Sequence, residues 1–150
     1  MKLSIAMCTY NGIAHLREQL ESISQQSRPP DELVACDDAS TDGTVEMLRA
    51  FADAASFPVR VHANERTLGV TGNFEQAIRF CTGDLIALCD QDDVWRADKL
   101  WRLADVMRER PDAGLVFTDA DVIDAGSQPT GWRLWQGARF DLSAQRRVNA

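Results

Sequence analysis

Short apolar runs alternate with amphipathic helical patterns along most of this 150-residue chain. After the first run, Leu3 to Cys8, the residues Ile13, Leu16, Leu20 and Ile23 recur at helical spacing. The same succession predicts five strands in all, at residues 3–8, 32–36, 58–63, 84–89 and 114–117. Because strands that alternate with helices form a mostly parallel sheet covered by helices, the pattern predicts an α/β, Rossmann-like fold.

Polar residues come directly after four of these predicted strands. They are Thr9-Tyr10-Asn11, Asp37-Asp38, the segment Asp90 to Asp93, and Asp119. In open parallel sheets, ligands bind beyond the carboxyl ends of the strands. We therefore expect these residues to gather at one edge of the sheet and to form a binding site.

The apolar run Leu85 to Cys89 ends in three closely spaced carboxylates, Asp90, Asp92 and Asp93. Like charges this close repel one another, and a divalent cation is the simplest offset. Asp90 and Asp92 occupy alternate positions, so in an extended segment both point to the same side. With the phosphates of a substrate they could hold Mg²⁺ or Mn²⁺. The alternative is a polar loop in which Asp93 caps the next helix.

The composition is that of a folded protein, with 45% hydrophobic and 26% charged residues. A net charge of -7 argues against a nucleic-acid-binding protein, which would show a basic face. Cys8, Cys36, Cys81 and Cys89 contain no C-x-x-C pair, so we expect reduced, buried thiols in a cytosolic protein. No apolar stretch is long enough to cross a membrane.

Four motifs, in this order and spacing, carry a family resemblance. They are Ala6 to Asn11, Asp37 to Thr44, Leu68 to Phe74, and Cys89 to Trp95. Together they resemble the family-2 glycosyltransferases, and particularly the bacterial rhamnosyltransferase-like members. The resemblance covers roughly residues 1–125 and implies a mostly parallel sheet of the GT-A type. We expect residues 1–125 to be the nucleotide-sugar-binding half of a GT-A domain, and residues 126–150 to begin the acceptor-side region of an incomplete domain.

The resemblance also implies roles for individual nucleotide-binding residues. Thr9 and Tyr10 would line the base, with Tyr10 packing on its ring, and Asn11 would shape that turn. Asp38 would accept a hydrogen bond from the imide N–H of uracil or thymine, and Asp90 would lie at the nucleotide as part of the D-x-D signature. Plainer alternatives are ordinary packing for Tyr10 and capping of the second helix for Asp38.

The same resemblance implies a metal site made of Asp92 and Asp90, with Asp92 as the direct ligand of Mn²⁺ or Mg²⁺. A metal that bridges two phosphates stabilises a diphosphate leaving group, and the acceptor hydroxyl needs a carboxylate base. The family places that base well downstream of the D-x-D motif, so we name no catalytic base and expect residues 1–150 to bind donor but transfer sugar poorly. Asp119 and Asp121 are candidate acceptor-site residues.

The sequence therefore predicts a metal-dependent, inverting glycosyltransferase that moves a sugar from a UDP- or dTDP-sugar to a hydroxyl of a bacterial surface glycan or lipid-linked acceptor. It predicts a cytoplasmic protein and leaves open peripheral association with the inner face of the membrane. The alternatives are a nucleotidyltransferase and a non-catalytic nucleotide-binding module. Trp132 and Trp135 fall at helical spacing, which favours core positions, and Trp95 is expected in the core or in a wall of the site.

Overall fold

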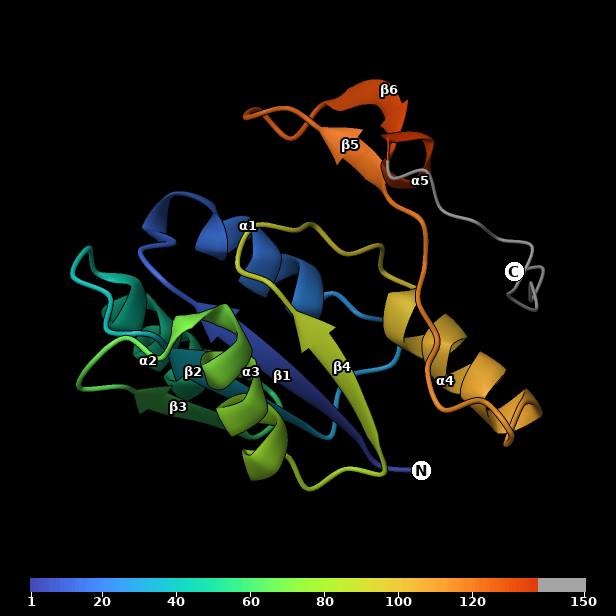
Figure 1. The fold of residues 1–150 in the computed structure, drawn as a ribbon, viewed down its shortest axis with the longest axis horizontal. Helices are drawn as coiled ribbons and strands as arrows, with labels where there is room; N and C mark the ends of the chain where they lie inside the picture. Colours follow the sequence, from blue (N-terminus) through green and yellow to red (C-terminus); the bar gives the residue numbers. More distant parts are fainter. Residues whose placement is uncertain (138–150) are drawn as a thin grey trace. The chain divides into compact units, whose positions relative to one another are not determined.

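The computed structural model describes residues 1–137, and the chain divides into two compact units, Met1–Ala104 and Asp105–Ala150 (Figure 1). The elements that begin in the first unit are β1 (Leu3–Thr9), α1 (Ile13–Ser24), β2 (Glu32–Asp37), α2 (Thr44–Ala54), β3 (Val59–Ala63), α3 (Gly69–Phe80), β4 (Leu85–Cys89) and α4 (Lys99–Glu109). The predicted alternation of strands and helices is confirmed over this part of the chain. No helix within residues 1–137 combines the length and the apolar character that a membrane span requires.

The first unit contains a four-stranded sheet with the order β3-β2-β1-β4. All three pairings are parallel, with Cys8 opposite Cys36 between β1 and β2 and Met7 opposite Cys89 between β1 and β4. β3, in which apolar and polar residues alternate, lies at one edge. The mostly parallel α/β fold is confirmed.

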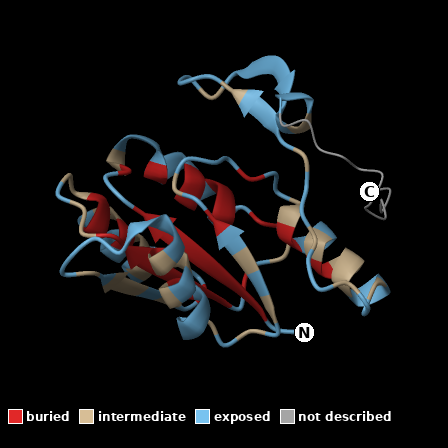
Figure 2. Cartoon of the chain, in the orientation of Figure 1, coloured by how far each residue is buried: buried red, intermediate tan, exposed pale blue. Residues whose placement is uncertain are grey.

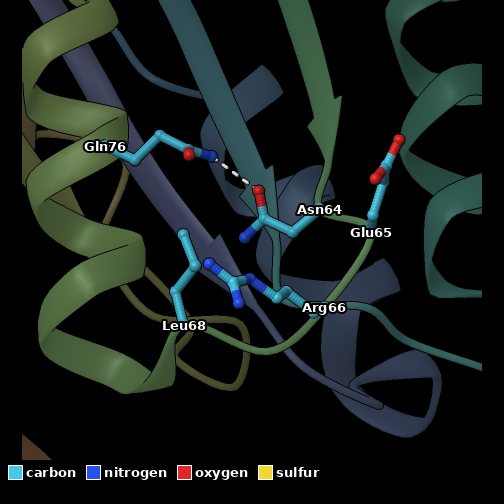
Figure 3. Close-up of a pocket in the computed structure, with 5 residues that line it drawn as sticks. All are labelled: Asn64, Glu65, Arg66, Leu68 and Gln76. Carbon is cyan, nitrogen blue, oxygen red and sulfur yellow. Dashed lines mark hydrogen bonds between the residues drawn. The ribbon is translucent and has the colours of Figure 1, made fainter.

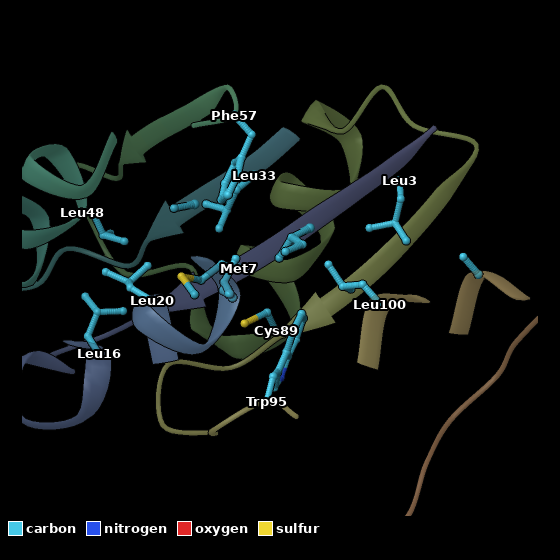
Figure 4. Packing of buried hydrophobic residues seen from close by; sticks show 14 residues of the cluster. Leu3, Met7, Leu16, Leu20, Leu33, Leu48, Phe57, Cys89, Trp95 and Leu100 are labelled. Atoms are coloured by element: carbon cyan, nitrogen blue, oxygen red, sulfur yellow. The ribbon is translucent and has the colours of Figure 1, made fainter. Parts of the chain in front are cut away.

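Helices cover both faces of the sheet, and the larger core lies on the side of α1 and α2 (Figure 4). Leu16 and Leu20 of α1 pack there against Met7 of β1 and Leu33 of β2. On the opposite face, Ala77 of α3 packs against Ala6 and neighbouring residues of β1 and β2. The two central strands are buried along their whole lengths, as the red ribbon in Figure 2 shows.

β4 is only partly buried, although its sequence is apolar throughout. Leu85, Ala87 and Cys89 pack into the larger core, whereas Leu88 on the other face remains 54% exposed. The reason is the strand order, because β4 forms an edge of the four-stranded sheet while α3 covers β1 and β2. Trp95, which follows this strand, is buried in the core.

The four cysteines are all free thiols. Cys8, Cys36 and Cys89 are buried and Cys81 is partly buried, which agrees with the predicted reduced state and, for three of them, with the predicted burial.

The second unit contains a short antiparallel pair, β5 (Asp121–Ile123) and β6 (Pro129–Arg133), followed by the single-turn helix α5 (Leu134–Gly137). The predicted fifth strand at residues 114–117 is wrong, since this segment has no strand structure. Its apolar side chains do not reach a continuous core, and Leu115 is 75% exposed. A local apolar run specifies a strand only when a sheet edge and a covering layer receive it.

The expectation that both late tryptophans lie in a core is also wrong for Trp132, which is 68% exposed on β6. Trp135 packs edge to face on Phe117, with 5.9 Å between ring centroids. The predicted helical spacing does not apply to this pair, because Trp132 belongs to a strand and Trp135 to the short helix that follows it.

Candidate functional site

The chain changes direction across the sheet between β1 and β4. β1, β2 and β3 follow one another toward one edge, whereas β4 returns to the other side of β1. In open parallel sheets the crevice for a ligand lies at such a reversal, beyond the carboxyl ends of the strands. The segments that meet at this point begin with Tyr10 after β1 and with Asp90 after β4.

The turn after β1 is held by side chains from the segment after β2. The Thr9 hydroxyl donates a 2.7 Å hydrogen bond to Asp37 Oδ2, and Thr9 and Asp37 are also register partners. Asn11 has a φ of 47°, its backbone N–H donates to Ser40 Oγ, and its Oδ1 accepts from the Thr41 N–H. Asn11 therefore stabilises this turn through its hydrogen bonds, and Asp37 holds the turn in place through Thr9.

Asp38 binds the beginning of α3. Its Oδ1 accepts from the Leu68 N–H at 2.6 Å and from Asn64 Nδ2 at 3.1 Å, and its Oδ2 accepts from the Gly69 N–H at 2.9 Å. These donors stabilise the buried carboxylate, since the first N–H groups of a helix have no partners within the helix. The capping alternative thus applies to α3 rather than to the second helix, where Asp42 accepts from the N–H and hydroxyl of Thr44.

Tyr10 and Gln91 join the turn after β1 to the D-x-D segment. The Tyr10 N–H donates to Gln91 Oε1 at 2.8 Å, and Gln91 Nε2 donates to the Tyr10 carbonyl at 3.1 Å. The Tyr10 side chain is 53% exposed. The base-stacking role predicted for Tyr10 therefore concerns an exposed residue whose backbone is hydrogen-bonded to the D-x-D segment.

The far end of the D-x-D segment is fastened to α1 and the residues after it. The Trp95 N–H donates to Ser22 Oγ at 3.0 Å, and the Arg96 carbonyl accepts from Gln26 Nε2 at 2.8 Å. Between the fastened ends, Asp92 and Asp93 are exposed. This arrangement presents two carboxylates to solvent on a segment that is held on both sides.

Negative charge accumulates at this end of β1. Burial raises the pKa of Asp90, and the nearby Asp93 and Asp92 raise it further. Burial also raises the pKa of the Cys8 thiol to about 12, with added contributions from Cys36, Asp90 and Asp38. Because one thiol at the end of β1 responds to both Asp38 and Asp90, the predicted base-reading and metal-binding carboxylates lie around the same strand end.

A pocket of about 460 Å³ lies beside the first turn of α3 and is lined by Asn64, Glu65, Arg66, Leu68 and Gln76 (Figure 3). Asn64 and Gln76 point toward one another, and Gln76 Nε2 donates to Asn64 Oδ1 at 2.7 Å. Asn64 and Leu68 also donate to Asp38, so this pocket adjoins the Asp38 carboxylate. Arg66 brings a cation to it.

Sequence reasoning missed Gln91, Arg66 and Gly12 as residues of this region. Gln91 could have been suspected as the one residue of the D-x-D motif with both a donor and an acceptor. Gly12 begins α1, and a Cβ placed on it would lie 2.1 Å from Gln91 Oε1. The signal for Arg66 was a cation two residues before the recognised Leu68 to Phe74 motif.

Asp119 and Asp121 belong to the second unit, where Arg133 is their common partner. Asp119 Oδ2 lies 2.7 Å from Arg133 Nε and Asp121 Oδ1 lies 3.7 Å from Arg133 Nη1. Burial acts to raise the pKa of Asp119, but hydrogen bonds from Arg133, Trp135 and Ala120 lower it overall. An ion-paired carboxylate of lowered pKa is a poor proton acceptor, so the geometry gives Asp119 a role in holding the hairpin.

The fold is that of GT-A glycosyltransferases, in which helices flank a mostly parallel sheet. The model of glycosyl transferase family 2 matches residues 4–148, and this chain belongs to that family. The expected resemblance is thereby confirmed.

Three known proteins illustrate the similarity. The glucosyltransferase WfgD of Escherichia coli, described as transferring from UDP-Glc to alpha-D-GlcNAc-diphosphoundecaprenol, is 33% identical over 65% of this chain and 38% of its own length. TarS of S. aureus, solved with UDP-GlcNAc, superimposes with a TM-score of 0.67 at 26% identity over 74% of this chain and 32% of its own. The mannosyltransferase PcManGT of Pyrobaculum calidifontis, solved with GDP-Man and Mn²⁺, gives 0.66 at 25% identity over 82% and 36%. The chain spans less than half the length of the curated relatives it matches.

Proposed function

We propose that this chain binds the donor of a glycosyltransferase that moves a sugar from a UDP- or dTDP-sugar to a hydroxyl of a bacterial surface glycan. The observation that carries the proposal is the contact between Tyr10 and Gln91 at the reversal of strand order. It joins the backbone of Tyr10, an exposed aromatic residue, to the residue that lies between Asp90 and Asp92 in the D-x-D segment. A nucleoside diphosphate needs both surfaces, one for its base and one for its phosphates.

The base is read by Asp38 and packed by Tyr10 in this proposal. Asp38 Oδ1 already accepts two hydrogen bonds, whereas its Oδ2 accepts one from Gly69. A carboxylate oxygen has two lone pairs, so Oδ2 has room for the imide N–H of a pyrimidine. Thr9 and Asn11 support the turn that carries Tyr10.

Asp92 and Asp90 are the proposed metal ligands, with Asp92 binding directly. Within residues 1–137, no three Asp, Glu, His or Cys residues are grouped so that they could hold a metal ion by themselves. Two carboxylates are nevertheless the usual protein contribution to a Mg²⁺ or Mn²⁺ ion that also binds substrate phosphates. The repulsion that Asp93 and Asp92 exert on Asp90 fits this donor set, because a bound divalent cation would relieve it.

When bound, the metal would supply Lewis-acid stabilisation of the charge that develops on the leaving diphosphate. The chain's own residues then have three tasks: Asp38 and Tyr10 orient the nucleoside, the D-x-D carboxylates would hold the metal that offsets the diphosphate charge, and Gln91 keeps these parts in register. The acceptor hydroxyl attacks the anomeric carbon as the glycosidic C–O bond to phosphate breaks. Direct displacement inverts the anomeric configuration, and the hydroxyl proton passes to a base outside the set named here.

The relatives support a surface-glycan acceptor. WfgD is named for a lipid-linked diphosphoundecaprenol acceptor, which would bring such an enzyme to the cytoplasmic face of the membrane. By analogy, we place this protein in the cytoplasm, with its acceptor presented at the membrane surface.

A thermal-shift panel tests the donor proposal. Residues 1–150 would be mixed with UDP, dTDP, GDP and ADP, each with and without Mn²⁺. A nucleotide at a hundred times its dissociation constant stabilises by about 2.7 kcal/mol, which is readily measured. We expect the largest shifts with UDP or dTDP in the presence of Mn²⁺, and equal shifts with ADP would contradict the base assignment. Release of free UDP from a UDP-sugar in the presence of metal then separates a transferase from a binding module.

A further inference from the structure

We propose that Gln91 is a positioning residue that couples the metal carboxylates to the nucleotide-binding turn, so that metal and nucleotide bind cooperatively. This inference rests on the proposed function. The inference extends the proposed function by assigning the cooperativity to one side chain, which contacts neither the metal nor the nucleotide.

The hydrogen-bond pair between Gln91 and Tyr10 closes a ring between two segments that lie 81 residues apart in sequence. A primary amide is the side-chain group that offers a donor and an acceptor side by side, as the N–H and carbonyl of Tyr10 require. A carboxylate at this position would face the Tyr10 carbonyl with a second acceptor. The identity of residue 91 is therefore matched to a backbone rather than to a ligand.

Gly12 leaves the space that the Gln91 side chain occupies. A Cβ at position 12 would lie 2.1 Å from Gln91 Oε1 and 2.4 Å from its Cδ. The backbone of Gly12 has a φ of -103°, which any residue can adopt. Its lack of a side chain is thus explained by the amide of Gln91 and not by backbone strain, and an alanine there would push the amide away from Tyr10.

The position of Gln91 makes the coupling direct. Its neighbours on either side are Asp90 and Asp92, the proposed metal ligands, while its partner Tyr10 carries the ring proposed to pack on the base. The hydrogen bond from the Trp95 N–H to Ser22 Oγ fixes the other end of the segment. A shift of the turn after β1 would pull on Gln91 and would then move the two carboxylates, because Gln91 is directly bonded in the chain to both Asp90 and Asp92.

Reciprocal coupling follows from thermodynamic linkage, so Mn²⁺ should raise the affinity for UDP by the same factor by which UDP raises the affinity for Mn²⁺. Couplings of this kind typically amount to about 5- to 150-fold. We expect Gln91→Met, which keeps the length of the side chain and removes both hydrogen bonds, to reduce the Mn²⁺-dependent gain in UDP affinity by about five-fold or more.

The experiment measures UDP binding by calorimetry with and without Mn²⁺ for residues 1–150 and four variants. Gln91→Met and Gly12→Ala remove the same contact from opposite sides, and the double variant tests whether they act through it. Gln25→Met is the matched control, since Gln25 is exposed at the end of α1. Thermal unfolding of each variant reports whether the fold is retained.

The proposal expects both single variants to lose more UDP affinity in the presence of Mn²⁺ than in its absence, and to show no further loss when combined. An unchanged gain in Gln91→Met would overturn it. Equal losses with and without Mn²⁺, accompanied by a lower Tm, would mean that Gln91 only supports the fold and would also overturn it. If the unaltered chain binds UDP with no gain from Mn²⁺, the proposed metal site fails and the coupling fails with it.

Discussion

Ser4 and Glu32 are register partners on β1 and β2, and the Ser4 hydroxyl donates a 2.6 Å hydrogen bond to Glu32 Oε1. The same carboxylate accepts from the N–H and hydroxyl of Thr82 and from Arg60 Nη2. The side chain of Glu32 is 7% exposed. One buried acid thus joins strands β1, β2 and β3 and the segment before β4.

The pKa of Glu32 predicts how the stability of this unit depends on pH. Burial acts to raise this pKa, but the hydrogen bonds from Ser4, Thr82 and Arg60 outweigh it and lower the value from 4.5 to about 2. A lowered folded-state pKa stabilises above the unfolded-state pKa, and this stabilisation is lost as pH falls through the folded value. The shift corresponds to roughly 3 kcal/mol, at about 1.4 kcal/mol per pKa unit.

We therefore expect Glu32→Gln to lower the free energy of unfolding by roughly 3 kcal/mol at pH 7. The difference between the two proteins should shrink as pH falls from about 4.5 toward 2, because the Glu32 carboxylate of the unfolded wild-type chain takes up a proton in this range before that of the folded protein does. Urea unfolding at pH 7, 4.5 and 3 checks the trend. A difference that stays constant over this range would show that Glu32 stabilises through its shape and not through its charge.

Asp92→Asn should weaken Mn²⁺-assisted UDP binding and leave the fold intact. The amide keeps the shape of the exposed side chain and removes the charge that a divalent ion requires. Loss of residues that merely orient metal ligands costs about 10- to 100-fold in affinity, so loss of a direct ligand should cost at least ten-fold. Calorimetry with Mn²⁺ checks this, and Asp53→Asn on α2 provides an exposed control. Unchanged Mn²⁺-dependent affinity would remove the metal assignment.

Asp38→Ala should weaken UDP binding about ten-fold to a hundred-fold, because a hydrogen bond to a charged group contributes roughly 1.5–3 kcal/mol. This variant also loses the hydrogen bonds from Leu68 and Gly69, so weaker binding alone would not show that Asp38 contacts the base. A second test therefore changes the ligand instead of the protein. N3-methyl-UDP lacks the imide N–H and leaves the protein intact. The wild type should bind it less tightly than UDP, whereas Asp38→Ala should bind both alike. Equal wild-type affinities would exclude imide recognition by Asp38.

Gly83→Ala should destabilise the sheet at the amino-terminal ends of β1 and β4. An added Cβ would lie 2.8 Å from Ser4 N and 2.9 Å from the Lys2 carbonyl oxygen, both of which are backbone atoms. Overpacking of this kind typically costs about 1–3 kcal/mol. Gly114→Ala is the matched control, since a Cβ there meets no atom within 4 Å. Thermal unfolding of the two variants should separate them, and equal Tm values would contradict the close approach.

Local sequence pattern determined most of the elements of the first unit. Helical spacing of Leu16, Leu20 and Ile23 marked α1, and short apolar runs marked β1 to β4, because side-chain periodicity follows directly from backbone geometry. The ordered motifs also identified the family, which the match over residues 4–148 confirms. The roles of Thr9, Tyr10, Asn11, Asp38, Asp90 and Asp92 at a bound ligand stay predictions.

The same local rule failed where tertiary surroundings decide. Residues 114–117 are mostly apolar but form no strand. Leu88 is half exposed, although it lies within the continuous apolar run Leu85 to Cys89. An apolar residue becomes buried only if another layer covers it, and nothing in the run itself records whether that layer is present.

The order of the strands in the sheet is known only from the tertiary structure. Any order of four parallel strands would satisfy the apolar pattern, but the order β3-β2-β1-β4 brings Gln91 to Tyr10. It also gives two adjacent acids different partners, since Asp37 accepts a hydrogen bond from Thr9 and Asp38 accepts one at the start of α3. The sequence by itself determined which residue types follow each strand, and long-range packing decided which of them meet, because hydrogen bonds across the sheet join residues that no local periodicity relates.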